Sequence, residues 1–283
     1  MKVGIILKNE TPIFSKHIFA LCALFVLAGG ILSAPFNADS GYTVYAFLIS
    51  AVLGCVIYFF VAKYLTKNKM LLPFAVFASF VSAVDCAADF CVFIKNSLLN
   101  KMSIFLIAAV FVTLIIYVVL KDYVALLKFS LIAAFFTLVL IIFFFLVTAE
   151  NFKISNVFPT KDSGSLAPLY TYFKKIVLPM FVLPYFNEFY FEKPIKKHSF
   201  FGVATGYGIL FLTIINSLLV FGGKFAQRVL YPYAAAVSTV TFGSFFTRLD
   251  GFAYIIYFSA VVVRTATCVL VIKKALTKRR VFA

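Results

Sequence analysis

The hydrophobic pattern of the chain is a series of long apolar runs separated by short polar stretches that carry lysine or arginine. A helix needs roughly 20 apolar residues to cross a hydrocarbon core of about 30 Å. We predict eight such spans, at about 17–36, 42–63, 71–94, 102–120, 123–147, 172–191, 199–221 and 251–272. The pattern therefore predicts an all-α, polytopic membrane bundle with a single integral membrane domain over residues 1–283.

A ninth apolar segment, YPYAAAVSTVTFGSFF at 231–246, is short and rich in small residues. We interpret it as a re-entrant or interfacial helix, with a full span as the alternative. The first apolar run is expected to be a retained helix and not a cleaved signal peptide, because a second full-length span follows it.

The longest connection, residues 148–171, is rich in turn-forming residues and separates five spans (1–147) from three (172–272). With eight spans, one set of alternate loops carries sixteen Lys and Arg residues and the other carries nine. The positive-inside rule then predicts that both termini are cytoplasmic and that 148–171 is external. If 231–246 crossed the membrane, five C-terminal charges would move outside and this bias would disappear.

Composition supports the same class, since 64% of the residues are hydrophobic, 13% are charged and the mean hydropathy is +1.06. The net charge of +16 is distributed between the apolar runs, which favours a role in topology over nucleic-acid binding. The five cysteines lie inside apolar runs and form no Cys-x-x-Cys pair, so we expect them to be buried apolar residues. Because no catalytic, phosphate-binding or metal-binding motif is found, we expect neither an enzyme nor a cofactor.

Ionisable residues inside a membrane are costly and suggest function. Asp85 and Asp89 lie four residues apart, on one face of the third span. Two close carboxylates at low dielectric favour one bound proton, so the pair is a candidate for cation binding or proton relay; the alternative is a polar stripe packed against neighbouring helices. Arg264 lies deep in the last span, where it needs an anionic partner such as Asp85, Asp89 or Glu188, a polar cavity, or a route to the interface.

Prolines interrupt the sixth span, in which Pro179 and Pro184 precede Asn187 and Glu188. Each proline removes a backbone donor, so we predict a break near the middle of this span and carbonyl groups that need other partners. In the first span, Gly29 and Gly30 are followed by Ser33 and Pro35, which also weakens a continuous helix. Interruptions in two spans at equivalent places indicate a transporter-like site at the midplane.

The segment YPYAAAVSTVTFGSFFTRLDGFAYIIYFSAVVV resembles the late part of the spore germination permease family, the B components of GerA-type germinant receptors. The residues that carry this likeness are Pro232, Gly243, Phe246, Arg248, Leu249 and Asp250. AGGILSAPF in the first span is similar to the broken first helix of the same family. We expect Asp250 to cap the last helix and Arg248 to reach lipid headgroups or a carboxylate.

This resemblance implies the five-plus-five inverted repeat (LeuT/APC-like) of the amino acid-polyamine-organocation superfamily, with the first repeat at 1–147 and part of the second at 172–272. It implies a germinant receptor subunit of the bacterial cell membrane or spore inner membrane that binds a small germinant such as an amino acid. The implied partners are an A-type membrane subunit and a C-type lipoprotein. The expected ligand-binding residues are Gly29, Gly30, Ser33, Asn187 and Glu188. The expected ionic or proton-handling residues are Asp85, Asp89 and Arg264.

The sequence departs from the family pattern in two respects: it supplies eight of ten spans, and it contains no tryptophan after the Arg-Leu-Asp element. An incomplete repeat weakens the case for alternating-access transport more than the case for ligand sensing. Two alternatives therefore stay open. One is an ion- or proton-coupled amino-acid transporter, and the other is a scaffold that stabilises a partner without transporting anything.

Overall fold

A computed structural model describes residues 11–31, 36, 40–65, 71–157, 167–191, 196–239 and 250–280. The structure is 91% helical and contains no strand within these ranges. It is an all-α polytopic bundle, as the hydrophobic pattern predicts.

Seven of the eight predicted spans form one helix each. Their bounds are α1 Thr11–Gly30, α2 Ser40–Phe60, α3 Leu72–Ser97, α4 Ile104–Leu120, α5 Tyr123–Val147, α8 Lys196–Ala226 and α10 Asp250–Arg280. A π-helical turn, η1 (Val61–Leu65), continues α2. Five of these helices, α2, α3, α5, α8 and α10, are long and apolar enough to cross a membrane, while α1 and α4 are shorter apolar helices.

Local sequence explains several helix boundaries. Ser103 precedes α4, and its hydroxyl accepts the backbone N–H of Leu106 at 3.4 Å. Asp122 adopts a left-handed backbone (φ 80°) between α4 and α5, and its carboxylate accepts the N–H of Tyr123 at 2.8 Å. These side chains satisfy donors that the first turn of a helix leaves free. The tight connection makes α4 and α5 antiparallel neighbours.

The predicted external loop contains two short 3₁₀ turns, η3 (Thr148–Asn151) and η4 (Ile154–Asn156). The N–H of Lys153 and the side-chain amide of Asn156 both donate to the carbonyl of Leu219 on α8, at 3.0 and 3.1 Å. Just beyond this point Gly222 has φ 70° and ψ 164°, which interrupts α8 in a conformation that favours glycine. The loop is therefore held against the end of α8.

α9 (Pro232–Ser238) is a seven-residue helix within the segment predicted to be re-entrant or interfacial. At 1.5 Å per residue its length is about 10 Å, far short of a hydrocarbon core. Most of its side chains are buried, and it packs between α8 and α10. Residues 240–249 lie outside the described ranges, Arg248 among them, and α10 begins at Asp250, one residue before the predicted start of the last span at 251.

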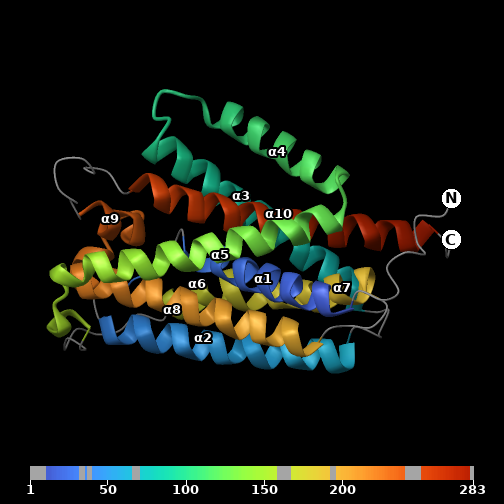
Figure 1. Cartoon of the computed structure of the whole chain (residues 1–283), viewed down its shortest axis with the longest axis horizontal. Coiled ribbons are helices and arrows are strands. Elements are labelled where there is room, and N and C mark those ends of the chain that lie inside the picture. Colours follow the sequence, from blue (N-terminus) through green and yellow to red (C-terminus); the bar gives the residue numbers. More distant parts are fainter. Residues whose placement is uncertain are drawn as a thin grey trace.

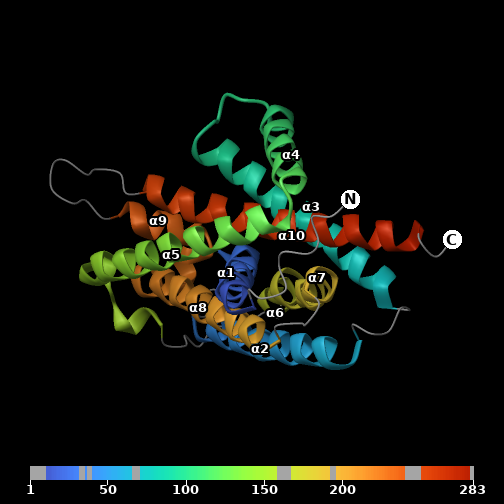
Figure 2. The same cartoon turned by 45° about the vertical axis from the view of Figure 1, so that its right-hand side comes forward.

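The bundle has an inner and an outer set of helices. α1 lies in the interior, against α5, α8 and α10 (Figure 1). In the apolar window of α10, 78% of the residues are buried, against 28% in α5. α4 lies at the periphery beside α3, away from α1 and α8 (Figure 2). Apolar side chains exposed on the outer helices are the surface that a membrane protein presents to lipid.

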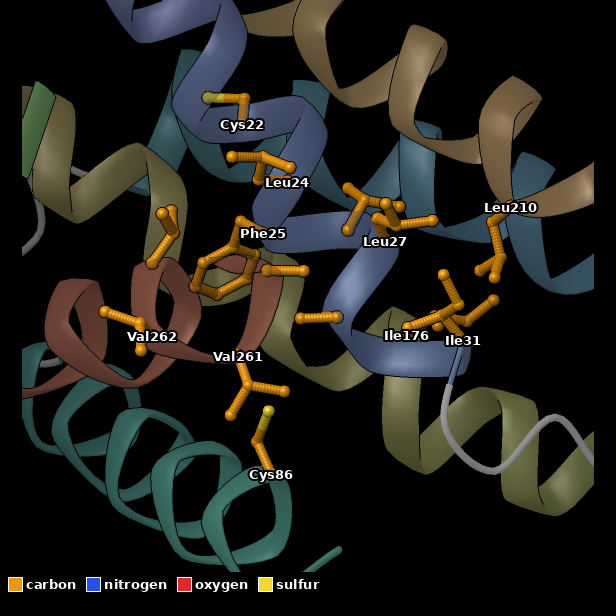
Figure 3. Packing of buried hydrophobic residues seen from close by; sticks show 14 of the residues in the cluster. Cys22, Leu24, Phe25, Leu27, Ile31, Cys86, Ile176, Leu210, Val261 and Val262 are labelled. Atoms are coloured by element: carbon orange, nitrogen blue, oxygen red, sulfur yellow. The ribbon is translucent and has the colours of Figure 1, made fainter. Parts of the chain in front are cut away.

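Side chains of α1 radiate toward several neighbouring helices. Phe25 points at Val261 and Val262 of α10, and Ile31 meets Ile176 and Leu210 beyond the end of the helix (Figure 3). From Ile18 to Ile31 nearly every described side chain of α1 is buried. An element that is apolar on all sides and buried on all sides holds the bundle together. Polar groups next to α1 therefore lie in the interior of the protein.

Candidate functional site

The sixth span is irregular along its length. It consists of α6 (Ala167–Tyr172), a π-helical turn η5 (Phe173–Val177), a 3₁₀ turn η6 (Leu178–Phe181) and α7 (Val182–Tyr190). The predicted interruption is thus present, but the backbone stays in the right-handed helical region at its joints, with Val177 at φ −88° and Val182 at φ −76°. The span changes its helical type and does not unwind. Turns of π- and 3₁₀-helix inside a helix are frequent at functional sites.

Pro179 leaves one backbone carbonyl of this span without its usual helical hydrogen-bond donor. The carbonyl of Lys175 lies four residues before Pro179, which has no N–H to donate. This carbonyl accepts a hydrogen bond from Nη2 of Arg264 at 2.8 Å. The next carbonyl, that of Ile176, accepts the hydroxyl of Tyr207 at 3.1 Å. Side chains from α10 and α8 therefore bind the carbonyl groups of the irregular turn.

The end of α1 meets this turn at Gly29. A side chain at this position would clash with Nη1 of Arg264, and its Cβ would lie 2.6 Å from the carbonyl oxygen of Lys175. Any residue larger than glycine would separate the end of α1 from the irregular turn of the sixth span. The neighbouring Gly30 has a packing role instead, since a Cβ there would lie 2.7 Å from a methyl group of Leu210. Ser33 lies outside the described residues.

Arg264 is 2% exposed and is the largest fully buried side chain of the protein's described part. Its Nε donates to Ser82 Oγ on α3 at 3.0 Å, and its Cζ lies 5.3 Å from the centre of the Phe25 ring. Its Nη1 has no hydrogen-bond partner. We call Gly29, Ser82, the carbonyl of Lys175 and Arg264 the arginine centre. The carboxyl-terminal end of α1 adds partial negative charge beside the guanidinium.

Among the residues the structure describes, no acidic side chain forms an ion pair with Arg264. Asp85 binds Lys174 Nζ at 2.8 Å, and Asp89 binds Lys175 Nζ at 2.5 Å. Both lysines lie within the π-helical turn η5 of the sixth span, so each carboxylate has its own cation. Nor does Arg264 extend to the interface, since its guanidinium is held by Ser82 and the Lys175 carbonyl.

Asn187 belongs to a second buried polar cluster. Its Nδ2 donates to Ser199 Oγ at 2.8 Å and lies 3.4 Å from the Tyr58 hydroxyl. The Tyr58 hydroxyl donates to Ser199 Oγ at 2.5 Å, and Cys22 Sγ lies 3.1 Å from the same oxygen. We call Cys22, Tyr58, Asn187 and Ser199 the serine centre. Cys22 and Gly29 are seven residues apart on α1, so the two centres are separated by about 10 Å along the helix axis.

The predicted pocket residues are therefore divided between two places. Gly29 contacts Arg264, whereas Asn187 lies two turns away along α1, and Gly30 packs against α8. Glu188 is half-buried and takes part in neither of the two ion pairs found among the described residues. Two members of the arginine centre were not predicted, although both had a sequence signal. Ser82 is three residues before Asp85 on the same helical face, and Lys175 is four residues before Pro179.

Two surface grooves lie apart from both centres. Two apolar grooves of about 380 and 410 Å³ lie on the outer surface. The first is formed by the start of α3 and the end of α10, and the second by α4, α5 and α10. Over the described part of the chain, no group of three or more His, Cys, Asp or Glu side chains is placed to hold a metal ion. Neither groove is lined by a residue of the arginine centre or of the serine centre.

Comparison with known proteins identifies the family. Residues 70–283 match the family model of spore permeases, which is described as spore germination protein. Searches of curated proteins and of solved structures returned no match. The matched range includes the Arg-Leu-Asp element at 248–250 and all of α3 to α10, while the AGGILSAPF segment of the first span lies before it. Because the match covers well over half of the sequence and the helices have the length and apolarity of membrane spans, this chain belongs to the spore germination protein family of membrane permeases.

Proposed function

We propose that the protein is the small-molecule-sensing subunit of a germinant receptor, and that the interior junction between α1 and the sixth span receives an amino-acid germinant. One observation carries this proposal. The end of α1 and the irregular turn of the sixth span meet at the arginine centre, where the carbonyl of Lys175 lies against Gly29 and accepts a hydrogen bond from Arg264. A site built from interrupted helices at the level of the membrane interior is the arrangement that transporters use for substrates.

The end of α1 suits the ammonium group of such a ligand. A helix carries the equivalent of about half a negative charge at its carboxyl-terminal end, and its last carbonyl groups have no partner within the helix. α1 ends at Gly30, inside the bundle and beside the irregular turn of the sixth span. This location places hydrogen-bond acceptors in a region that excludes water, where electrostatic interactions are strong.

Partners and orientation complete the proposal. By family resemblance the protein would assemble with an A-type membrane subunit and a C-type lipoprotein in the bacterial cell membrane or spore inner membrane. The excess of Lys and Arg in one set of loops supports cytoplasmic termini. The start of α1 and the end of α10 lie at the same end of the bundle, as eight crossings require (Figure 1).

Coupled amino-acid transport has less support than sensing. Such a mechanism needs a carboxylate that can bind and release a cation or proton, and both Asp85 and Asp89 form ion pairs with lysines of the sixth span. Uptake of amino acids into proteoliposomes that depends on an ion gradient, and that falls in Asp85→Asn, would favour transport over sensing.

The deciding experiment is germination of spores from a strain that lacks this gene. Single amino acids are supplied as germinants, and the release of dipicolinic acid is followed over time. We expect the response to at least one amino acid to be lost and to return with the wild-type gene. Normal responses to every amino acid tested would overturn the proposal. Affinity purification from sporulating cells tests the partners, since A-type and C-type subunits are expected to copurify.

A further inference from the structure

The arginine centre carries an uncompensated positive charge. A guanidinium group stays protonated in proteins at any pH that they tolerate, so the buried side chain of Arg264 is a permanent cation. Its immediate partners are the Ser82 hydroxyl, the Lys175 carbonyl and the Phe25 ring, none of which is charged. Placing a cation in a low-dielectric interior without a counterion is strongly unfavourable.

The nearby acidic residues do not remove this charge. Asp85 and Asp89 are each bound to a lysine, at 2.8 and 2.5 Å, so the two carboxylates and the two lysines balance one another. With Arg264 added, this group of five side chains has a formal charge of +1. The dipole of α1 contributes only part of the missing negative charge.

The hydrogen bonds of Arg264 leave one position open. Nε and Nη2 have partners in Ser82 and Lys175, while Nη1 is buried and has none. A buried donor without an acceptor loses its hydration and gains nothing in return, which is more costly for a charged group than for a neutral one. Nη1 occupies the space in which a side chain at position 29 would lie, directly at the end of α1.

We infer that Nη1 of Arg264 is the binding position for a small anion, a carboxylate or a halide, at the junction of α1 and the sixth span. An anion at this position would supply both the missing acceptor and the missing negative charge. Bonds between guanidinium and carboxylate groups are among the strongest hydrogen bonds in proteins. The inference rests on the proposed function in one respect, since the carboxylate of the sensed molecule would be the anion that the centre receives.

Thermal unfolding of the purified full-length protein in detergent tests this inference. The buffer contains a bulky sulfonate as its only anion, and sodium acetate, sodium chloride or acetamide is titrated in. Acetate and acetamide have the same shape and differ in charge, so acetamide shows the effect of a neutral ligand. We expect acetate or chloride to raise the unfolding midpoint through preferential binding to the folded state, and acetamide to leave it unchanged.

Two variants locate the effect. Arg264→Met removes the buried cation, and Lys121→Met removes the same charge at the exposed end of α4. Arg264→Met should weaken acetate binding about 10- to 100-fold, the value of a hydrogen bond to a charged group. Lys121→Met should keep the wild-type response. The readout is the difference between acetate and acetamide within each variant, so a change in the intrinsic stability of a variant does not affect it.

Equal responses to acetate, chloride and acetamide in the wild-type protein would overturn the inference, whether or not Arg264→Met folds. An anion response retained in Arg264→Met would overturn it as well. The proposed function fails by a different result, namely normal germination of the deletion strain. An anion response that depends on Arg264, together with normal germination, would leave the anion site standing and remove the sensing role.

Discussion

The arginine centre and the serine centre lie about 10 Å apart along α1, yet they satisfy their polar groups in different ways. In the serine centre, Ser199 Oγ is contacted by Tyr58, Asn187 and Cys22, and all four side chains are uncharged. In the arginine centre a permanent cation is surrounded by neutral groups and keeps one donor without an acceptor. The serine centre also leaves one buried polar atom, Oδ1 of Asn187, without a partner, but that atom is neutral, and an unpaired charged group costs more than an unpaired neutral one.

The two centres also differ in the helices that form them. The serine centre joins the regular helices α1, α2, α7 and α8 through one hydroxyl group. The arginine centre is formed where α1 ends and where the sixth span passes through its π-helical and 3₁₀ turns. We propose that the serine centre stabilises the bundle and that the arginine centre binds ligand. Substitutions in the two centres should separate these roles.

The largest effect is expected for Gly29→Ala. The added methyl group would clash with Nη1 of Arg264 and approach the Lys175 carbonyl to 2.6 Å, and backbone atoms yield little. Overpacking of this kind typically costs about 1–3 kcal/mol, and we expect a value near 3 kcal/mol. The unfolding midpoint in detergent and the germination response should both fall. Gly208→Ala on α8 is the matched control, because a Cβ there meets no atom within 4 Å.

If Gly29→Ala and Gly208→Ala lowered the unfolding midpoint equally, the result would contradict the close approach of α1 to the sixth span. A lower midpoint with an unchanged germination response would contradict the assignment of ligand binding to the arginine centre, since it would show that Gly29 matters for packing alone.

A smaller effect, on stability alone, is expected for Ser199→Ala. The substitution removes the acceptor shared by Tyr58 and Asn187, and buried donors left without partners cost about 1–3 kcal/mol. The unfolding midpoint should fall, while the amino-acid concentration that gives a half-maximal germination response stays unchanged. Ser217→Ala is the control, since Ser217 lies on the same helix and bonds only the Thr213 carbonyl. A shift in that concentration would place the serine centre in the ligand site.

Much of the fold could be predicted from the sequence, because apolar runs of membrane length specify helices without reference to their neighbours. The interruption of the sixth span was predictable for the same reason, since Pro179 and Pro184 act on the backbone locally. The contacts that these elements make with one another could not be predicted from the sequence. Which face of α3 meets the sixth span depends on tertiary packing, so the assignment of Asp85 and Asp89 to Lys174 and Lys175 required the structure.

The same limit explains why one predicted pocket became two centres. Gly29 and Asn187 lie in the first and the sixth span, and the sequence does not indicate at what depth in the membrane those two spans cross. The structure places Asn187 beside Cys22, seven residues before Gly29 on α1. The contact between Gly29 and Arg264 joins residues 235 positions apart, beyond what periodicity can indicate. The inverted repeat stays a prediction.

The smallest effects are expected at the ion pairs between α3 and the sixth span. These pairs are partly exposed, with side-chain exposures of 43% and 23% for Lys174 and Asp85, and 13% and 33% for Lys175 and Asp89. Exposed pairs contribute at most about 1 kcal/mol, so Asp85→Asn and Asp89→Asn should each lower the free energy of unfolding by that amount or less. Asp89→Asn should have the larger effect, because its lysine is the more buried of the two. Each variant differs from wild type in its free energy of unfolding, and raising the salt concentration should reduce this difference. The reduction should be greater for Asp85→Asn than for Asp89→Asn, since salt screens exposed charges best. If Asp89→Asn lowered the free energy of unfolding by well above 1 kcal/mol, this carboxylate would also compensate the charge of Arg264. The arginine centre would then need no external anion, and in this respect it would not differ from the neutral serine centre.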